Sequence, residues 1–84
     1  PTKAAALAAL AADATAARAN LQANGSWPDI TYSEVPSGTW SPAIHYERML
    51  LLAQAYRAPG SSLQGDVATR AAYLNAYVYI QTQF

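Results

Sequence analysis

The sequence predicts a small all-α protein. Three segments, residues 2–24, 42–57 and 66–83, carry apolar residues at the three- and four-residue spacing of amphipathic helices. Stretches containing glycine and proline separate these segments, and alanine, the strongest helix former, dominates the first of them. The 84 residues form one small domain at most. A domain of this size buries only roughly 60–65% of the surface of its unfolded chain.

The first helix is expected over residues 2–24. Its apolar stripe consists of Leu7, Leu10, Ala14, Ala17 and Leu21. Asn24-Gly25 follows, and this pair tolerates the left-handed conformation that closes many helices. Because alanine buries little area, we expect this helix to lie flat against a larger neighbour. Coiled-coil pairing is the alternative for an alanine-rich segment, but three leucines are too few to sustain it.

The connection over residues 25–41 lacks a helical period and is rich in Ser, Thr, Pro and Gly. Connections of this length are uncommon in compact domains unless they are functional, ordered by their own side chains or disordered. Trp27, Tyr32 and Trp40 argue against disorder, because aromatic rings bury about 150–250 Å² each when they are packed. We expect an ordered loop whose three aromatic residues fix the first helix to the second.

The second helix is predicted over residues 42–57, with Ser41 as its N-cap and Pro42 at its first position. Pro59 and the glycine after it end the helix. On a helical wheel a broad apolar arc contains Tyr46, Met49, Leu50, Leu52, Ala53 and Tyr56. Ile44 and Leu51 lie on the opposite side. A helix with apolar residues on two sides needs two neighbours.

The third helix is predicted over residues 66–83, where the negative charge of Asp66 suits a helix N-terminus. Two apolar stripes run along it, one made of Val67, Ala71, Leu74 and Val78 and the other of Tyr73, Tyr77, Ile80 and Phe84. Both apolar stripes need neighbouring elements that bury them. The pattern continues to Phe84 without a C-cap, so we expect the 84 residues to be the beginning of a longer helical array.

Charge and composition exclude several function classes. Five basic residues balance five acidic ones, and this scattered neutral pattern argues against nucleic acid or an anionic membrane surface as a partner. No apolar run approaches the ~20 residues that a membrane span needs. The absence of cysteine and the presence of a single histidine argue against disulfides and a zinc site, and we expect no cofactor. Pro1-Thr2-Lys3 resembles a processed terminus, which together with the absence of cysteine favours a secreted or periplasmic bacterial protein.

Five residues of the loop and of the second helix are weak candidates for a binding or catalytic role. His45 falls inside the apolar arc of the second helix, where a lone histidine is more often a hydrogen-bonded core residue than a general base. Trp27 and Trp40 are candidates for a sugar-stacking platform, but anchoring the loop is the favoured role. Asp29 and Glu34 are the two carboxylates of the loop, and a carboxylate pair is what a glycoside hydrolase requires. Asp29 is more simply a turn or cap acceptor.

Tyrosines of the third helix form a second candidate set. Tyr73 and Tyr77 share a helix face and are expected in the core, whereas Tyr79 points elsewhere and is a candidate for a polar cleft. The sequence contains no phosphate-binding glycine loop, no metal-ligand spacing and no nucleophile elbow. The residues alone therefore assign no catalytic group.

The middle of the chain resembles a known enzyme family. The matching stretches are Asn20-Leu21, Gly25-Ser26-Trp27-Pro28-Asp29-Ile30-Thr31-Tyr32, Trp40 five residues before His45, Ala55-Tyr56, Ser61-Ser62 and Gly65-Asp66. In this order they resemble the start of the α-helical catalytic domain of polysaccharide lyase family 8, which includes chondroitin AC, hyaluronate and xanthan lyases. The resemblance covers roughly residues 16–80. The sequence departs from the family pattern at Leu63-Gln64, where Tyr-Tyr is common, and at Tyr77-Val78-Tyr79, where Tyr-Trp is common.

The resemblance implies an incomplete (α/α) toroid of helical hairpins followed by β-sandwich domains. It implies β-elimination on a uronic-acid polysaccharide, in which an Asn neutralises the carboxylate and a Tyr/His pair performs the acid–base steps. The family's catalytic residues and its Asn-Trp-Trp aromatic patch follow the equivalent of Phe84, so no catalytic residue is carried over. His45 and Tyr32 do not match the catalytic histidine and tyrosine of the family.

The expected function is therefore the N-terminal portion of a lyase that cleaves hyaluronan, chondroitin or xanthan, with lyases of alginate or glucuronan as related possibilities. The implied partners are the acidic polysaccharide and the remainder of the same polypeptide, packed on the apolar helix faces. Two alternatives stay open, namely a glycoside hydrolase or carbohydrate-binding helical array, and a non-enzymatic helical module that dimerises through its surplus apolar faces.

Overall fold

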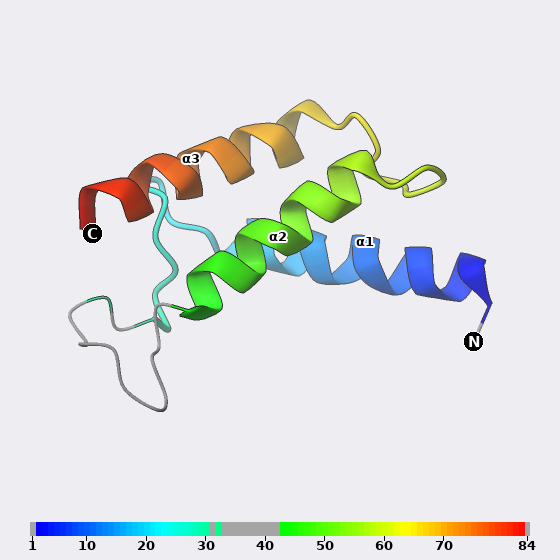
Figure 1. The fold of residues 1–84 in the computed structure, drawn as a ribbon, viewed down its shortest axis with the longest axis horizontal. Helices are drawn as coiled ribbons and strands as arrows, with labels where there is room; N and C mark the ends of the chain where they lie inside the picture. The colour runs from blue at the N-terminus through cyan, green and yellow to red at the C-terminus, as the bar shows by residue number, and fades with distance from the viewer. Residues whose placement is uncertain (1, 31, 33–42, 84) are drawn as a thin grey trace.

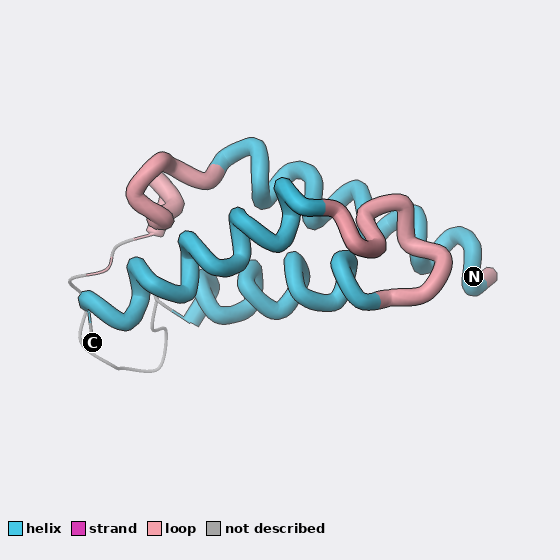
Figure 2. Tube along the Cα trace, turned by 90° about the horizontal axis from the view of Figure 1, so that it is seen from above, coloured by secondary structure: helices cyan, strands magenta, loops and turns pink. Residues whose placement is uncertain are grey.

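The computed structural model describes residues 2–30, 32 and 43–83, and this part of the chain is all-helical. It contains α1 (Lys3–Asn20), α2 (Ala43–Arg57) and α3 (Val67–Gln83). Figures 1 and 2 show that α2 and α3 form an antiparallel hairpin and that α1 packs against α2, with a smaller contact to α3. None of the helices in these ranges has the length and apolar character that crossing a bilayer requires.

Helix α1 begins and ends through local hydrogen bonding. The Thr2 hydroxyl caps its start by accepting from the backbone N–H of Ala5 at 3.0 Å. The helix ends at Asn20 because Leu21 has an extended backbone, with φ −69° and ψ 129°. The predicted end at residue 24 was therefore wrong. Gly25 does have a positive φ of 93°, but it belongs to the following turn and does not close the helix.

The side of α1 that packs against the rest of the fold is made of small residues. Ala11, Ala14 and Ala17 are buried, whereas Leu7 and Leu10 of the predicted stripe are only half-buried. Alanine at the contact lets neighbouring backbones and large side chains approach the helix closely. The expectation that α1 lies flat against a larger neighbour agrees with this packing.

The core face of α2 differs from the predicted arc. His45, Met49, Leu52 and Ala55 are buried, but Tyr46 and Leu50 are exposed. Hydropathy alone selects Leu50 and ranks the polar His45 and the small Ala55 low. The actual face is set by its neighbours, because Ala55 allows close packing and His45 finds two hydrogen-bond partners.

The core face of α3 also differs from the prediction. It consists of Thr69, Ala72, Ala76 and Ile80, whose spacing of three and four residues is helical. The stripe formed by Val67, Ala71, Leu74 and Val78 is exposed, and Tyr77 of the second stripe is exposed as well. Phe84, the last member of that stripe, lies outside the described residues. Ala72 and Ala76 belong to the same buried cluster as the larger Trp27, Met49 and Leu52.

A polar cluster joins α1 to the start of α3. The Arg18 guanidinium donates to the Asp66 carboxylate at 2.8 Å and to the Thr69 hydroxyl at 3.2 Å. Asp66 accepts from the backbone N–H of Thr69 at 2.9 Å, as a helix cap does. These hydrogen bonds, first those from Thr69 and then that from Arg18, lower the pKa of Asp66. The prediction that Asp66 suits the start of this helix is confirmed, with the helix itself beginning at Val67.

Candidate functional site

The loop after α1 carries a tight turn that presses against α3. Within it, the N–H of Gln22 donates to the carbonyl of Ser26 at 2.8 Å, and the N–H of Gly25 donates to the carbonyl of Gln22 at 2.9 Å. A side chain on Gly25 would place its Cβ 2.3 Å from the carbonyl oxygen of Asn75. The Asn75 amide in turn donates to the carbonyl of Ala23 at 3.1 Å. Glycine is therefore required for both its backbone angle and its lack of a side chain.

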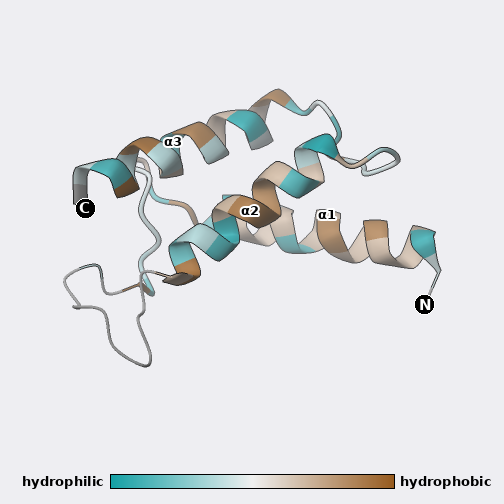
Figure 3. Cartoon of the chain, viewed as in Figure 1, coloured by the Kyte–Doolittle hydropathy of each residue, from teal (hydrophilic) through white to brown (hydrophobic). Residues whose placement is uncertain are grey.

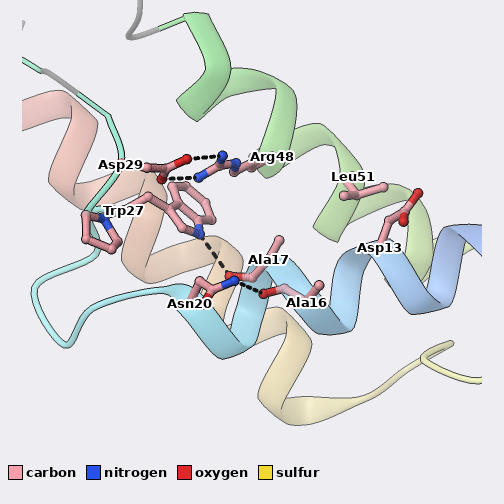
Figure 4. A pocket seen from close by; sticks show the side chains of 9 residues that line it. Asp13, Ala16, Ala17, Asn20, Trp27, Asp29, Arg48 and Leu51 are labelled. Carbon is pink, nitrogen blue, oxygen red and sulfur yellow. Dashed lines mark hydrogen bonds and ion pairs between the residues drawn. The ribbon is translucent and has the colours of Figure 1, made fainter.

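Trp27 follows this turn and is only 1% exposed. Its indole Nε1–H donates to the carbonyl of Ala17 in the last turn of α1 at 2.8 Å, which Figure 4 shows. The bond satisfies a carbonyl near the helix C-terminus that has no partner within the helix. Trp27 therefore anchors the loop. Its ring has no free face on which a sugar can stack, so the candidate role as a sugar platform is excluded for this residue.

His45 is fully buried at 0% exposure, and both of its ring nitrogens are hydrogen-bonded. Nε2 lies 2.8 Å from the carbonyl oxygen of Ala76, which can only accept, so this nitrogen carries a proton. Nδ1 lies 2.7 Å from the hydroxyl of Tyr32. In a neutral ring Nδ1 is then the acceptor and the Tyr32 hydroxyl is the donor. The favoured interpretation of His45, a hydrogen-bonded core residue, agrees with this geometry.

The Tyr32 hydroxyl also accepts from the backbone N–H of Trp27 at 2.9 Å. A single chain of hydrogen bonds thus runs from Trp27 through Tyr32 and His45 to Ala76 on α3. We call this the Trp27–Ala76 hydrogen-bond chain. It connects the loop, α2 and α3, and every donor in it meets an acceptor.

Aromatic rings surround this hydrogen-bond chain. The Trp27 and His45 rings meet edge to face with centroids 4.9 Å apart, and the Tyr32 and Tyr79 rings do the same at 4.9 Å. The Tyr46 ring, on the same helix as His45, also meets the His45 ring edge to face, with centroids 6.2 Å apart. Tyr79 was a candidate for a polar cleft, but it packs on Tyr32 instead. Tyr73 and Tyr77 stack on each other with planes 7° apart; Tyr73 is partly buried against the core, as expected, whereas Tyr77 is exposed.

Burial controls the titration of the central pair. It lowers the pKa of His45 below its ordinary value of 6.5, a shift that the Arg48 charge increases and the hydrogen bond to Ala76 opposes. It also raises the pKa of Tyr32 above its ordinary value of 10.0. Both groups are therefore neutral at pH 7. A tyrosine and a histidine at 2.7 Å have the geometry of an acid–base pair, but the His45 ring has no surface that a substrate can reach.

An ion pair covers the outer side of Trp27. The Arg48 guanidinium donates to both oxygens of Asp29, at 2.8 and 2.7 Å, and its Cζ lies 5.4 Å from the centroid of the Trp27 ring. Figure 4 shows the pair above the indole, beside a groove of about 440 Å³ between α1 and α2. The hydrogen bond from Arg48 lowers the pKa of Asp29 and raises that of Arg48. Asp29 is thus held as an ionised carboxylate and does not have the raised pKa of a general acid.

Comparison of the chain with protein-family models, with curated proteins and with solved structures finds no match.

Two candidate residues from the sequence, Trp40 and Glu34, lie outside the described residues. In residues 2–30, 32 and 43–83, no group of three or more His, Cys, Asp or Glu side chains is arranged to hold a metal ion. Sequence reasoning identified Trp27 and Tyr32 as residues that lock the loop, and both do so. It missed the pairing of Asp29 with Arg48, whose only sequence signal is their opposite charge.

Proposed function

We propose that this chain is the N-terminal, structural portion of the catalytic domain of a polysaccharide lyase similar to family 8. The enzyme would cleave a uronic-acid polymer such as hyaluronan, chondroitin or xanthan by β-elimination, outside the cell or in the periplasm. The catalytic groups would be supplied by the remainder of the polypeptide. The role of residues 1–84 would be to build the first helical hairpins against which that remainder packs.

The observation that carries this proposal is the structural use of the stretch that resembles the family. Gly25 allows the turn to touch α3, and Trp27 binds α1 through its indole N–H. Asp29 pairs with Arg48 of α2, and Tyr32 bonds to His45 of the same helix. Residues of a motif that all fix helices to one another are what a scaffold requires. None of them is left free to act on a substrate.

The surplus apolar surface also supports the proposal. Both α2 and α3 keep large apolar side chains exposed on the sides that face away from the core. Figure 3 shows hydrophobic segments at several positions around both helices. Isolated soluble domains seldom expose such surface in continuous patches, which mark sites where other elements pack. Further helices of the same polypeptide would cover them.

The test is an elimination assay on the full-length protein that contains this chain. Hyaluronan, chondroitin sulfate, xanthan and alginate are supplied separately, and the ultraviolet absorbance of the unsaturated product is followed. The proposal expects absorbance to rise with at least one polymer. Release of reducing ends without absorbance would favour a hydrolase, and absence of product from every uronic-acid polymer would defeat the lyase assignment.

A non-enzymatic helical module is the second candidate, and the same exposed apolar side chains favour it. In that case residues 1–84 alone would form a stable folded oligomer. Sedimentation of the isolated chain distinguishes the candidates, since a scaffold fragment is expected to form no defined oligomer. The hydrolase alternative has less support, because Asp29 is already bound by Arg48.

A further inference from the structure

A continuous furrow runs along the outer side of the α2–α3 hairpin. One section is lined by Tyr46 and Met49 of α2 and by Tyr77 and Ile80 of α3, and it has a volume of about 510 Å³. The next section, of about 260 Å³, is lined by Ala53 and Arg57 of α2 and by Arg70 and Leu74 of α3. Tyr73 lines both sections, so they adjoin. We call the whole the α2–α3 furrow.

Both rims of the furrow have helical spacing. The α2 rim contains Tyr46, Met49, Ala53 and Arg57, and the α3 rim contains Arg70, Leu74, Tyr77 and Gln81. Each rim advances in steps of three and four residues over about 16 Å of helix axis at 1.5 Å per residue. Figures 1 and 3 show α2 and α3 running antiparallel beside each other, so the two rims run along the same hairpin. Parallel ridges of this kind form the groove into which another helix packs.

The furrow exposes more apolar surface than an isolated helical hairpin needs. Tyr46 is 46% exposed, Leu74 is 41% exposed and Tyr77 is 43% exposed. All three line the furrow. Burying side chains of this size against a partner removes apolar area from water, which is the main favourable contribution to association.

The charges of the furrow are concentrated at one end. Arg57 and Arg70 both line the section away from Tyr46. Neither arginine forms an ion pair within residues 2–30, 32 and 43–83, whereas Arg18 and Arg48 each bind a carboxylate there. Arg57 is the last residue of α2, where a cation suits the helix dipole, but Arg70 lies in the first turn of α3, where a cation is unfavourable. The stability of α3 therefore does not explain Arg70.

We propose that the α2–α3 furrow is the docking site of an amphipathic helix whose first turn carries carboxylates that lie over Arg57 and Arg70. Beyond its first turn, that helix presents small or branched apolar side chains to Leu74, Tyr77 and Tyr46. Acidic residues in its first turn also suit its own dipole, so the helix runs antiparallel to α2. Assigning this helix to the same polypeptide rests on the proposed function, but the preference of the furrow for such a helix does not.

The test measures binding of synthetic helices to the ¹⁵N-labelled chain by chemical-shift perturbation. The probe is an alanine-rich peptide of about 18 residues, long enough to be helical, with glutamates in its first turn and leucines at three- and four-residue spacing. A second probe replaces those glutamates with lysines. We expect saturable shifts at Tyr46, Leu74 and Tyr77 with the first probe. Absence of saturable shifts at peptide concentrations in the millimolar range would overturn the proposal.

Charge reversal supplies the specific readout. The variant with Arg57→Glu and Arg70→Glu should bind the glutamate probe roughly three- to thirtyfold more weakly, as expected for two exposed ion pairs, and should bind the lysine probe better than the native chain does. Lys3→Glu, a charge reversal on α1, is the control and should change neither affinity. Equal binding of the two probes to the native chain would contradict the proposal.

The apolar contact has its own matched pair of variants. Leu74→Glu should abolish binding, whereas Val78→Glu, also exposed on α3 but outside the lining of the furrow, should leave it nearly unchanged. Sedimentation of the native chain tests the other occupant, since a dimer that Leu74→Glu dissociates would show that a second copy fills the furrow. Either result is independent of whether the full-length protein has lyase activity.

Discussion

The hydroxyl of Tyr32 lies 2.7 Å from Nδ1 of His45 and 2.9 Å from the backbone nitrogen of Trp27. One hydroxyl therefore joins a loop residue to the first turns of α2, while the other ring nitrogen of His45 binds Ala76 of α3. A buried hydrogen-bond chain of this kind costs little when complete and much when one member is removed. It specifies how the loop sits on the α2–α3 hairpin.

Replacing Tyr32 by phenylalanine should destabilise the fold without altering its shape. The substitution keeps the ring that packs on Tyr79 but removes the hydroxyl, which leaves Nδ1 of His45 and the Trp27 N–H without their partner. We expect a loss of about 1–3 kcal/mol, the cost of unsatisfied buried polar groups. Tyr79→Phe is the matched control, since it keeps the ring contact and leaves the Trp27–Ala76 hydrogen-bond chain intact. Equal stability of the two variants in urea unfolding would contradict the assignment.

His45 should make stability depend on pH between neutrality and mild acid. Its pKa is lowered in the folded protein, chiefly by burial, so the unfolded chain binds the proton more readily. The contribution of His45 is therefore complete above the unfolded value of 6.5 and is lost as the pH falls from there through the folded pKa. The positive charge of Arg48 also lowers the pKa of His45. Midpoints of thermal unfolding measured from pH 8 to pH 4 should decline across this window.

The matched variant is His45→Gln, which is less stable at pH 8 and should lack the decline above pH 5. Asp29 and Asp66 do not contribute to the decline in this window, because their pKa values are lowered from 3.8 and they titrate at more acid pH. In the proposed full-length lyase, His45→Gln should leave the pH dependence of kcat/KM unchanged. A shifted profile in a folded variant would show that His45 has a catalytic role.

Gly25 should be harder to replace than the other glycines of the described residues, Gly60 and Gly65. Its φ of 93° disfavours any side chain, and a Cβ would lie 2.3 Å from the carbonyl oxygen of Asn75. Gly65 is the natural comparison, since its φ of 73° is also left-handed but a Cβ added there would have no atom within 4 Å. Gly65→Ala should lower the free energy of unfolding by only about 1–2 kcal/mol, the cost of holding a residue with a Cβ in the left-handed conformation. Gly25→Ala should cost clearly more, or prevent folding, and comparable costs in urea unfolding would contradict the close contact with α3.

Trp27 should contribute more stability than any other loop residue in the described part of the chain. Trp27→Ala removes a buried ring and should cost about 3–5 kcal/mol. Trp27→Phe retains most of the ring but loses the bond from Nε1–H to Ala17, and should cost less. Fluorescence-detected unfolding is unsuitable for these variants, so circular dichroism in urea is the measurement. A fully stable Trp27→Ala protein would show that the indole is not an anchor.

Helix existence was predictable from the sequence, but the faces that the helices bury were not. The alanine-rich segment, the capping role of Asp66 and the stop at Pro59 are local signals, and they placed the helices to within a few residues. Burial depends on partners that are distant in sequence. Thr69 and His45 are inside because Asp66 and Tyr32 satisfy their polar atoms, whereas Leu50 and Val67 are outside although their hydropathy predicts burial.

In the candidate site, too, the sequence predicts which residues are anchors but not which partners they bind. Aromatic composition was enough to predict that Trp27 and Tyr32 fix the loop, because large rings in a polar stretch must pack somewhere. Their specific partners, the Ala17 carbonyl and the His45 ring, lie 10 and 13 residues away and follow no periodic rule. The bidentate pairing of Arg48 with Asp29, 19 residues apart, could not be distinguished in the sequence from the other possible pairs of opposite charge.

The Asp29–Arg48 pair should contribute less to the free energy of unfolding than its bidentate geometry suggests. The Asp29 side chain is 62% exposed, and exposed ion pairs contribute only about 0–1 kcal/mol because water and salt screen them. Asp29→Asn should therefore cost less than about 1 kcal/mol, and added salt should reduce the difference from the native chain. Because the pKa of Asp29 is lowered from 3.8, its contribution is present above that pH and is lost as the pH falls through the folded value. Urea unfolding at low and high salt is the measurement. A cost as large as that of Trp27→Ala would mean that the carboxylate positions Arg48 over the indole and that this contact, rather than the ring's burial, holds the loop.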